Sequence, residues 1–276
     1  PPSRRTPPGP TRPPSAPARW RRPDAVTFVA LVAVVAFIVH GGMQGTLLGP
    51  EDVVSGTGRL GKFLGDAFPP STERLPAILA ALLVTVEMAV IGTVIGVILS
   101  VPLAVAAARN TSPNRIVYAV TRGFISVCRT IPDLIWGLIF VIAVGLGPKA
   151  GVLAIAVDVM GFCGRFFAES IEELDKGTVD GLRATGANER AVLGAGVLPA
   201  CLPSFVATSM FALESSARSS VVLGLVGAGG IGIELSVSMT LLRYDEALAI
   251  ILCIFVVVLG VERLSAHLRR RMIPAD

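Results

Sequence analysis

Residues 75–108 read LPAILAALLVTVEMAVIGTVIGVILSVPLAVAAA, an apolar run of 34 residues in which Glu87 is the only charged side chain. At ~1.5 Å per residue a single helix of this length would measure ~51 Å, whereas the hydrocarbon core of a bilayer is ~30 Å thick. The run therefore predicts a membrane-spanning helix that tilts, kinks near Pro102 or projects beyond the membrane.

The composition of the whole chain supports the same interpretation. Hydrophobic residues make up 53% of the 276 residues and charged residues only 16%, whereas a soluble domain carries about 25% charged residues. The 29 glycines would let membrane helices approach one another closely. We therefore predict an all-α, polytopic membrane protein.

Further apolar runs raise the expected number of transmembrane helices to about six. They cover residues 25–39, 119–145, 151–167, 199–216 and 247–261. A cleaved signal peptide is the alternative for the first run, but a long tail precedes it and no AxA-like site follows it. We expect a disordered Pro/Arg-rich tail over 1–23, a first transmembrane helix and external loop with some amphipathic structure over 24–74, and a basic tail over 266–276.

The distribution of basic residues predicts the orientation in the membrane. Six spans place both termini on one side. If that side is the cytoplasm, 16 of the 24 lysines and arginines lie in cytoplasmic segments and five in external ones. Such an excess is typical of cytoplasmic loops, so we expect a multi-pass protein of the cell membrane with both termini in the cytoplasm.

The segment between the fourth and fifth runs is unusually long for a connection and carries most of the functional information. Residues 169–199 read ESIEELDKGTVDGLRATGANERAVLGAGVLP. Glycines at 177, 186, 194 and 196 are expected to separate short amphipathic helices. A structured cytoplasmic surface over 168–198 suits docking of a partner, and a folded, solvent-exposed hairpin is the alternative.

This segment resembles the cytoplasmic motif of ABC-importer permeases. That motif begins with Glu-Ala-Ala, has Gly six positions after the Glu and ends in Leu-Pro thirteen positions after the Gly; here DGL (180–182), Gly186 and Leu198-Pro199 keep the spacing but change the opening triplet. Three further stretches, RTIPDLIWGLIF (129–140), VLPACLPSF (197–205) and SSVVLGLVGAGGIGIEL (219–235), resemble the permeases of phosphonate-type importers, whose substrates include phosphonate, phosphite and phosphate. The resemblance covers residues 75–265.

The resemblance implies a type I ABC-importer permease fold, a homodimeric pore, two ATP-hydrolysing partner subunits and an external substrate-binding protein. It also implies that the loop couples to the ATPase through a contact zone formed by Asp180, Gly181, Leu182, Arg183, Ala184, Thr185, Gly186, Ala187, Asn188 and Glu189. No GxxxxGK[ST] sequence occurs in the chain, so ATP and Mg²⁺ would be held by the partner subunits and this chain would not itself be an enzyme.

Ionisable side chains within the predicted spans are candidates for the translocation pathway, because each costs ~2.5–3.5 kcal/mol on insertion scales. Arg129, Glu214 and Arg218 are the main candidates, and Glu214 and Arg218 are four residues apart, so they can pair on one helix. Guanidinium groups match the geometry of oxyanions. The alternative is that these charges form structural ion pairs. Weaker candidates are Arg122, Glu87 and Asp158.

The glycine-rich block 227–232 satisfies GxGxxG, but no βαβ pattern surrounds it, so a dinucleotide site is not expected. We interpret Gly227, Gly229, Gly230 and Gly232 as a broken, close-packed membrane segment, either an external gate or a re-entrant turn that lines a cavity. The cysteines at 128, 163, 201 and 253 are far apart in apolar surroundings, which predicts neither a metal site nor a disulfide.

The expected function is transport of phosphonate-like oxyanions by a permease subunit that works with an ATPase. A related permease for another solute, such as methionine, is one alternative, and a self-sufficient secondary carrier or channel is another. A membrane-embedded enzyme is disfavoured because no catalytic cluster occurs. The arginine-rich tail lies beside the first apolar run, so anionic lipid is favoured over nucleic acid as its partner.

Overall fold

The computed structural model describes residues 25–43 and 50–272, which form helices and turns without a strand. The chain divides into two compact units between Gly61 and Lys62. The expected tail 1–23 and the last four residues of the expected tail 266–276 lie outside the described residues.

The first unit contains α1 (Ala25–Met43) and the beginning of α2 (Pro50–Ala67), which continues across the boundary. Helix α1 is apolar nearly throughout, and residues 26–40 are exposed in the isolated chain. Helix α2 mixes charged, glycine and apolar residues, with Leu60 and Leu64 one turn apart and both exposed. This helix agrees with the amphipathic structure expected after the first apolar run.

Four long helices dominate the second unit: α3 (Leu75–Ala107), α6 (Pro148–Glu172), α9 (Leu198–Leu225) and α11 (Tyr244–Met272). Each is long and apolar enough to cross a membrane. Helix α3 covers almost the whole predicted run and contains Pro102 without a break. Helix α11 continues past the apolar run 247–261 and ends at Met272, so the basic segment that follows this run is helical.

The predicted span 119–145 is broken in the structure. It consists of α4 (Arg115–Thr130) and α5 (Asp133–Val144), which meet at an angle of 93°. Pro132 lies at the break; proline disfavours a helical conformation for the residue before it, and Ile131 is extended.

The number of spans therefore differs from the six expected. In the described residues four helices qualify by length and composition, or five if α4 and α5 count as one span. Two further apolar helices of the described chain are shorter than a full span: Val26–Gly41, the apolar part of α1, and Ile231–Thr240.

Helix α6 is the centre of the second unit and packs against α3, α4, α5 and α9. A Cβ atom at Gly92 or Gly96 of α3 would lie 2.7 Å from the side chain of Ile155 or Val159 of α6, so these glycines allow the two backbones to approach closely. A buried hydrogen bond of 2.9 Å joins Thr93 of α3 to Ser216 of α9.

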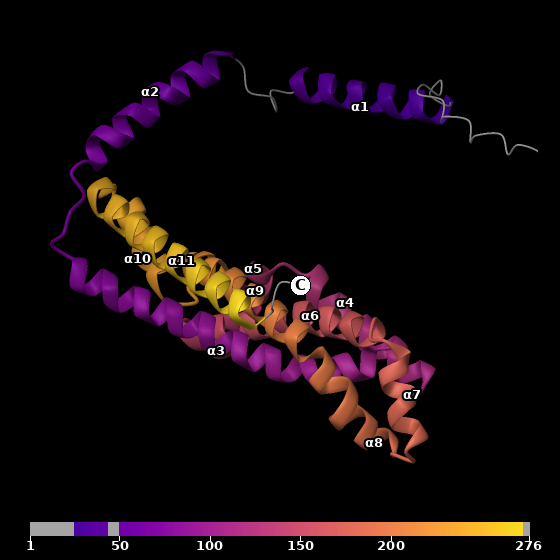
Figure 1. Cartoon of the computed structure of the whole chain (residues 1–276). Coiled ribbons are helices and arrows are strands. Elements are labelled where there is room, and N and C mark those ends of the chain that lie inside the picture. Colours follow the sequence, from indigo (N-terminus) through magenta and orange to yellow (C-terminus); the bar gives the residue numbers. More distant parts are fainter. Residues whose placement is uncertain (1–24, 44–49, 273–276) are drawn as a thin grey trace, which may run out of the picture. The chain divides into compact units, whose positions relative to one another are not determined.

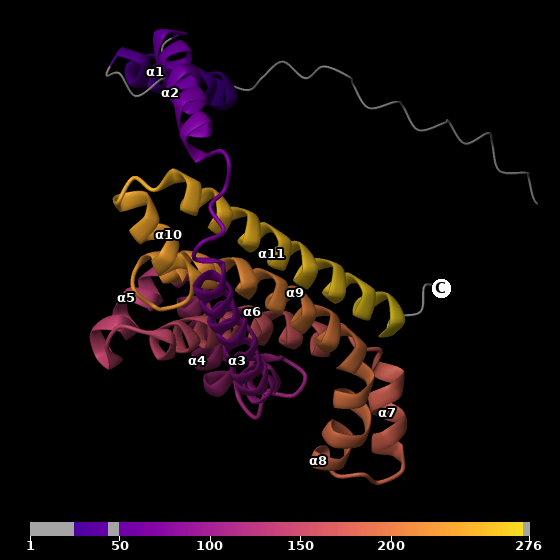
Figure 2. The same ribbon diagram turned by 90° about the vertical axis from the view of Figure 1, so that its left-hand side faces the viewer.

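Short elements occupy the two ends of this bundle. Helices α7 (Lys176–Ala184) and α8 (Glu189–Ala191) lie at one end, and α10 (Ile231–Thr240) lies at the other (Figures 1 and 2). A π-helical turn, Val192–Val197, joins α8 to α9. The loop predicted to dock a partner and the glycine-rich block are therefore at opposite ends of the second unit.

Candidate functional site

The loop between α6 and α9 is built from short helices, as its sequence predicts. Gly186 has a φ of +82° and donates its backbone N–H to the carbonyl of Arg183 at 3.0 Å, which ends α7 with a left-handed residue. Asn188 then caps α8, because its side chain accepts a hydrogen bond of 2.8 Å from the N–H of Ala191. Gly194 and Gly196, which were expected to separate helices, lie inside the π-helical turn.

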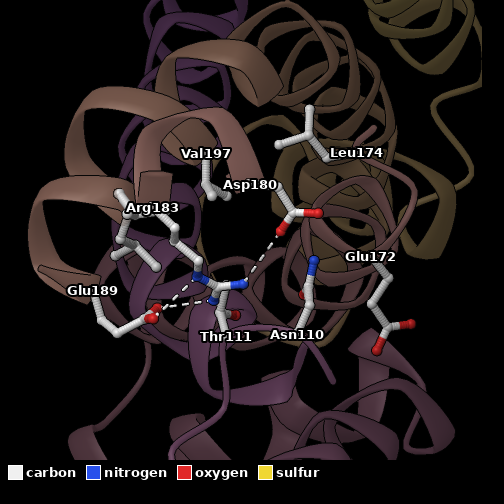
Figure 3. Close-up of a pocket in the computed structure, with 10 residues that line it drawn as sticks. Asn110, Thr111, Glu172, Leu174, Asp180, Arg183, Glu189 and Val197 are labelled. Carbon is white, nitrogen blue, oxygen red and sulfur yellow. Dashed lines mark hydrogen bonds and ion pairs between the residues drawn. The ribbon is translucent and has the colours of Figure 1, made fainter. Parts of the chain in front are cut away.

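Arg183 connects the two helices of this loop. Its Nε and Nη2 atoms donate hydrogen bonds of 3.1 and 3.0 Å to the two carboxylate oxygens of Glu189, and its Nη1 lies 3.9 Å from Asp180 (Figure 3). The hydrogen bonding to Glu189 raises the pKa of Arg183 above its usual range. The pair spans the Gly186 turn, so it holds α7 and α8 at a fixed separation.

A cavity of about 230 Å³ lies on the inner side of the loop (Figure 3). Asp180, Arg183 and Glu189 line it together with Val192, Leu193 and Val197 from the π-helical turn. The turn between α3 and α4 contributes Asn110 and Thr111, the last residue of α6 contributes Glu172, and Leu174 follows that helix. The loop thus faces two segments that precede it in the sequence.

Hydrogen bonds fasten the end of α6 to the turn between α3 and α4. The side chain of Asn110 donates to the carbonyl of Ile171 at 2.7 Å, and the backbone N–H of Arg109 donates to Glu172 Oε1 at 2.8 Å. Arg122 Nη2 lies 3.0 Å from the same carboxylate oxygen. A displacement of the loop would therefore be passed to α3, α4 and α6 together.

The structure brings together only part of the predicted contact zone. Asp180, Arg183 and Glu189 meet at the cavity, while Gly186 and Asn188 shape the chain around it. The sequence interpretation missed Asn110 and Glu172, whose roles depend on contacts between residues about 60 positions apart. The helix Lys176–Ala184 includes Gly181 and Leu182, and Ala187 packs partly against the core.

The charges predicted to line a pathway lie in two separate groups. Glu214 and Arg218 of α9 pair at 3.2 Å, as their spacing predicts, and Arg269 of α11 adds a contact of 3.4 Å to the other oxygen of Glu214. Glu214 is only 12% exposed, whereas Arg218 is 48% exposed. Arg129 lies on α4 and has no ion pair with Glu214 among the described residues.

The glycine-rich block forms a tight turn between α9 and α10. Gly227, Gly229 and Gly230 have φ values of +91°, +93° and +74°. A Cβ atom at Gly232 would lie 2.7 Å from the Cα of Gly224, so α9 and α10 touch through their backbones. The N–H of Ile231 donates to Thr85 Oγ1 of α3 at 2.8 Å. The block is therefore broken and close-packed, and its role as a gate stays a prediction.

Comparison with known proteins identifies the family. Residues 100–274 match the family described as binding-protein-dependent transport system inner membrane component. The chain belongs to this family. Its members are the membrane components of transport systems, in accord with the several apolar helices found here.

Individual relatives of this transport component carry more specific names. The chain is 38% identical to the phosphite transport system permease protein PtxC of Stutzerimonas stutzeri over 91% of this chain and 90% of that protein. It is 41% identical to the phosphate-import permease protein PhnE of Mycolicibacterium smegmatis over 61% of this chain and 32% of that protein.

A solved structure shares the fold. The inward-facing MetNI methionine ABC transporter matches with a TM-score of 0.65 at 18% identity, covering 74% of this chain and 99% of that one. This likeness confirms the expected ABC-importer permease fold and, at that identity, says nothing about the solute.

Proposed function

We propose that this chain is the membrane-spanning permease of an ATP-driven importer and forms the translocation pathway for phosphonate-like oxyanions: phosphonate, phosphite or phosphate. The observation that carries the proposal is the 38% identity to a phosphite permease over nine-tenths of both chains. Arginines placed among the membrane helices support it, since guanidinium groups bind oxyanions through paired hydrogen bonds.

The transport machinery would require partners. We infer a second copy of the chain, two ATPase subunits that hold ATP and Mg²⁺, and an external binding protein that delivers the anion. The family description, which names dependence on a binding protein, supports the last of these. Both termini and the loop between α6 and α9 would lie in the cytoplasm, because this orientation gives the cytoplasmic segments most of the lysines and arginines outside the predicted spans.

The loop would act as the coupling segment. Asp180 to Glu189 would contact the ATPase, and closure of the ATPases would push on α7 and α8. Arg183 joins α7 to α8, and Glu172, at the end of α6, contacts Arg109 after α3 and Arg122 on α4. A displacement of the loop would therefore reach several membrane helices at once. The anion would interact with Arg129, Glu214 and Arg218 during its passage. The external end would be gated by the glycine-rich block, which contains Gly227, Gly229, Gly230 and Gly232.

Reconstitution tests this proposal. The chain is purified with its ATPase and placed in liposomes, and uptake of phosphite, methylphosphonate, phosphate and methionine is measured with the binding protein outside and ATP inside. We expect ATP-dependent uptake of at least one phosphorus oxyanion and none of methionine. Uptake of methionine alone would overturn the substrate class, and oxyanion uptake without ATP and ATPase would indicate a self-sufficient carrier.

A further inference from the structure

A small pocket separate from the loop cavity gathers three arginines. It lies between α4 and α6 at the end of α3, has a volume of about 40 Å³, and is lined by Arg122, Ser126, Arg129, Arg165, Ala107 and Ala168. Arg122 and Arg129 are seven residues apart on α4, so they project from one face two turns apart. Arg165 comes from α6 and completes the group.

The arginines of this pocket are unequally neutralised. Arg165 pairs with Glu169 at 2.7 Å, and Arg122 lies 3.0 Å from Glu172. Arg129 lies 5.9 Å from the ring centroid of Phe166 and has no carboxylate within 4.0 Å in the described part of the chain. The lining itself contains three cations and no acidic residue, and the carboxylates that interact with these cations, Glu169, Glu172 and Asp158, lie outside the lining.

Arg122 has one buried donor atom that is ion-paired but poorly aligned for a hydrogen bond. Its Nη2 atom is buried but makes no hydrogen bond, although it lies close to Glu172. The carboxylate oxygen that it approaches already accepts the N–H of Arg109 at 2.8 Å. Buried donors in folded proteins nearly always find an acceptor; Glu172 compensates the charge of Arg122, and an oxygen atom of a ligand would offer this donor a better aligned acceptor.

The pocket suits a small oxyanion. Its polar groups are guanidinium forks and the Ser126 hydroxyl, which donate to tetrahedral oxygens. Ser126, Arg129 and Arg165 are exposed, so these side chains can close over a ligand larger than the present cavity. Ala107, the last residue of α3, and Ala168, near the end of α6, place the pocket toward the end of the bundle that carries the coupling loop.

We propose that Arg122, Arg129, Arg165 and Ser126 form a binding site for a phosphorus oxyanion near the loop end of the bundle. The ligand is either the transported anion shortly before release or the phosphate of an anionic lipid. The first source rests on the proposed function, whereas the second does not. The three arginines would share the anion, with Arg129 contributing a guanidinium that forms no ion pair within 4.0 Å in the described chain.

Charge-selective labelling tests the site. Ser126→Cys is introduced into the full complex in neutral phosphatidylcholine liposomes, and labelling rates with an anionic and a cationic methanethiosulfonate reagent of similar size are compared. The parent chain, in which Cys128, Cys163 and Cys201 are buried and Cys253 is half-buried, gives the background that is subtracted. We expect the anionic reagent to react at least about tenfold faster, since a basic pocket concentrates anions by such factors, and added phosphite to slow it.

Matched variants tie the effect to the arginines. Arg129→Gln in the Ser126→Cys chain should remove most of the preference and of the protection by phosphite. Arg263→Gln removes the same charge from an exposed position of α11 outside the pocket and should change neither. Equal rates for the two reagents, or a preference that survives Arg129→Gln, would overturn the site.

The source of the ligand is decided by the lipid. Protection by phosphite in neutral liposomes supports a site for the transported anion. Protection only after phosphatidylglycerol is added supports a lipid-phosphate site and overturns the transport role. Absence of protection in both overturns the proposal. Phosphite uptake by the unaltered complex is measured separately, so protection without uptake contradicts the proposed function alone, and uptake without protection contradicts this site alone.

Discussion

Arg183 reaches across the turn at Gly186 and donates hydrogen bonds to both carboxylate oxygens of Glu189, at 3.1 and 3.0 Å. Both side chains are exposed, with 44% and 76% of their surfaces accessible. Exposed ion pairs contribute little to folding stability because water and salt screen them. The value of this pair therefore lies in fixing the angle between α7 and α8.

Breaking this pair should uncouple transport with little effect on folding. Arg183→Gln is expected to lower oxyanion uptake per ATP hydrolysed, since α7 could then move independently of α8, while the thermal stability of the purified chain stays near that of the parent. The double exchange Arg183→Glu with Glu189→Arg should restore part of the coupling. A double exchange as impaired as the single variant would mean that Arg183 acts through some other contact.

Gly186→Ala should impair the loop through backbone strain alone. Nothing lies within 4 Å of an added Cβ atom, but the φ of +82° is unfavourable for alanine and costs about 1–2 kcal/mol locally. We expect reduced coupling and faster proteolysis within residues 176–197. Gly194→Ala is the control, because its Cβ atom would also meet open space and its φ is not left-handed. Equal behaviour of the two variants would contradict the explanation.

Removing the carboxylate of Glu214 should destabilise the bundle. The single amide oxygen of Glu214→Gln would leave either Arg218 or Arg269 without its charged acceptor, and losing such a bond at a partly exposed site costs about 1 kcal/mol. Glu214→Gln should therefore lower the temperature at which the purified chain loses its monodisperse peak in size-exclusion chromatography.

Arg218→Gln should affect uptake more than stability. Normal uptake by folded Arg218→Gln at parental abundance would exclude a pathway role for this residue.

The contact between α9 and α10 should not tolerate a side chain. Gly232→Ala places its Cβ atom 2.7 Å from the Cα of Gly224, and such overpacking costs about 1–3 kcal/mol. We expect little folded protein in the membrane. Gly260→Ala on α11 would meet nothing within 4 Å and should accumulate normally. Normal abundance of Gly232→Ala would show that the turn at 227–230 is looser than described.

Much of the fold follows from hydrophobic runs, but breaks and tertiary contacts do not. The run from Leu75 predicts α3 to within one residue at its end. The break at Pro132 was not foreseen, because the stretches 123–128 and 134–145 on its two sides are largely apolar and together look like one run. The left-handed Gly186 agrees with its place in a loop motif, since such a turn favours glycine.

The functional positions were predictable only where the partners are close in sequence. The pairing of Glu214 with Arg218 follows from a spacing of four residues. The contact between Glu214 and Arg269 does not, because these residues are 55 positions apart and lie on different helices. Similarly, the grouping of Arg165 with Arg122 and Arg129 depends on how α6 packs on α4. The coupling, pathway and gate roles remain predictions.

Site-specific crosslinking gives the most direct test of the central claim, that an ATPase acts on this bundle through the loop around Gly186. A photoreactive side chain replaces Ala184, which is exposed at the end of α7, or Leu242, which is exposed just after α10 at the opposite end. In the intact complex we predict a crosslink to the ATPase from position 184 and none from position 242. A crosslink to the ATPase from position 242 and none from position 184 would contradict the account.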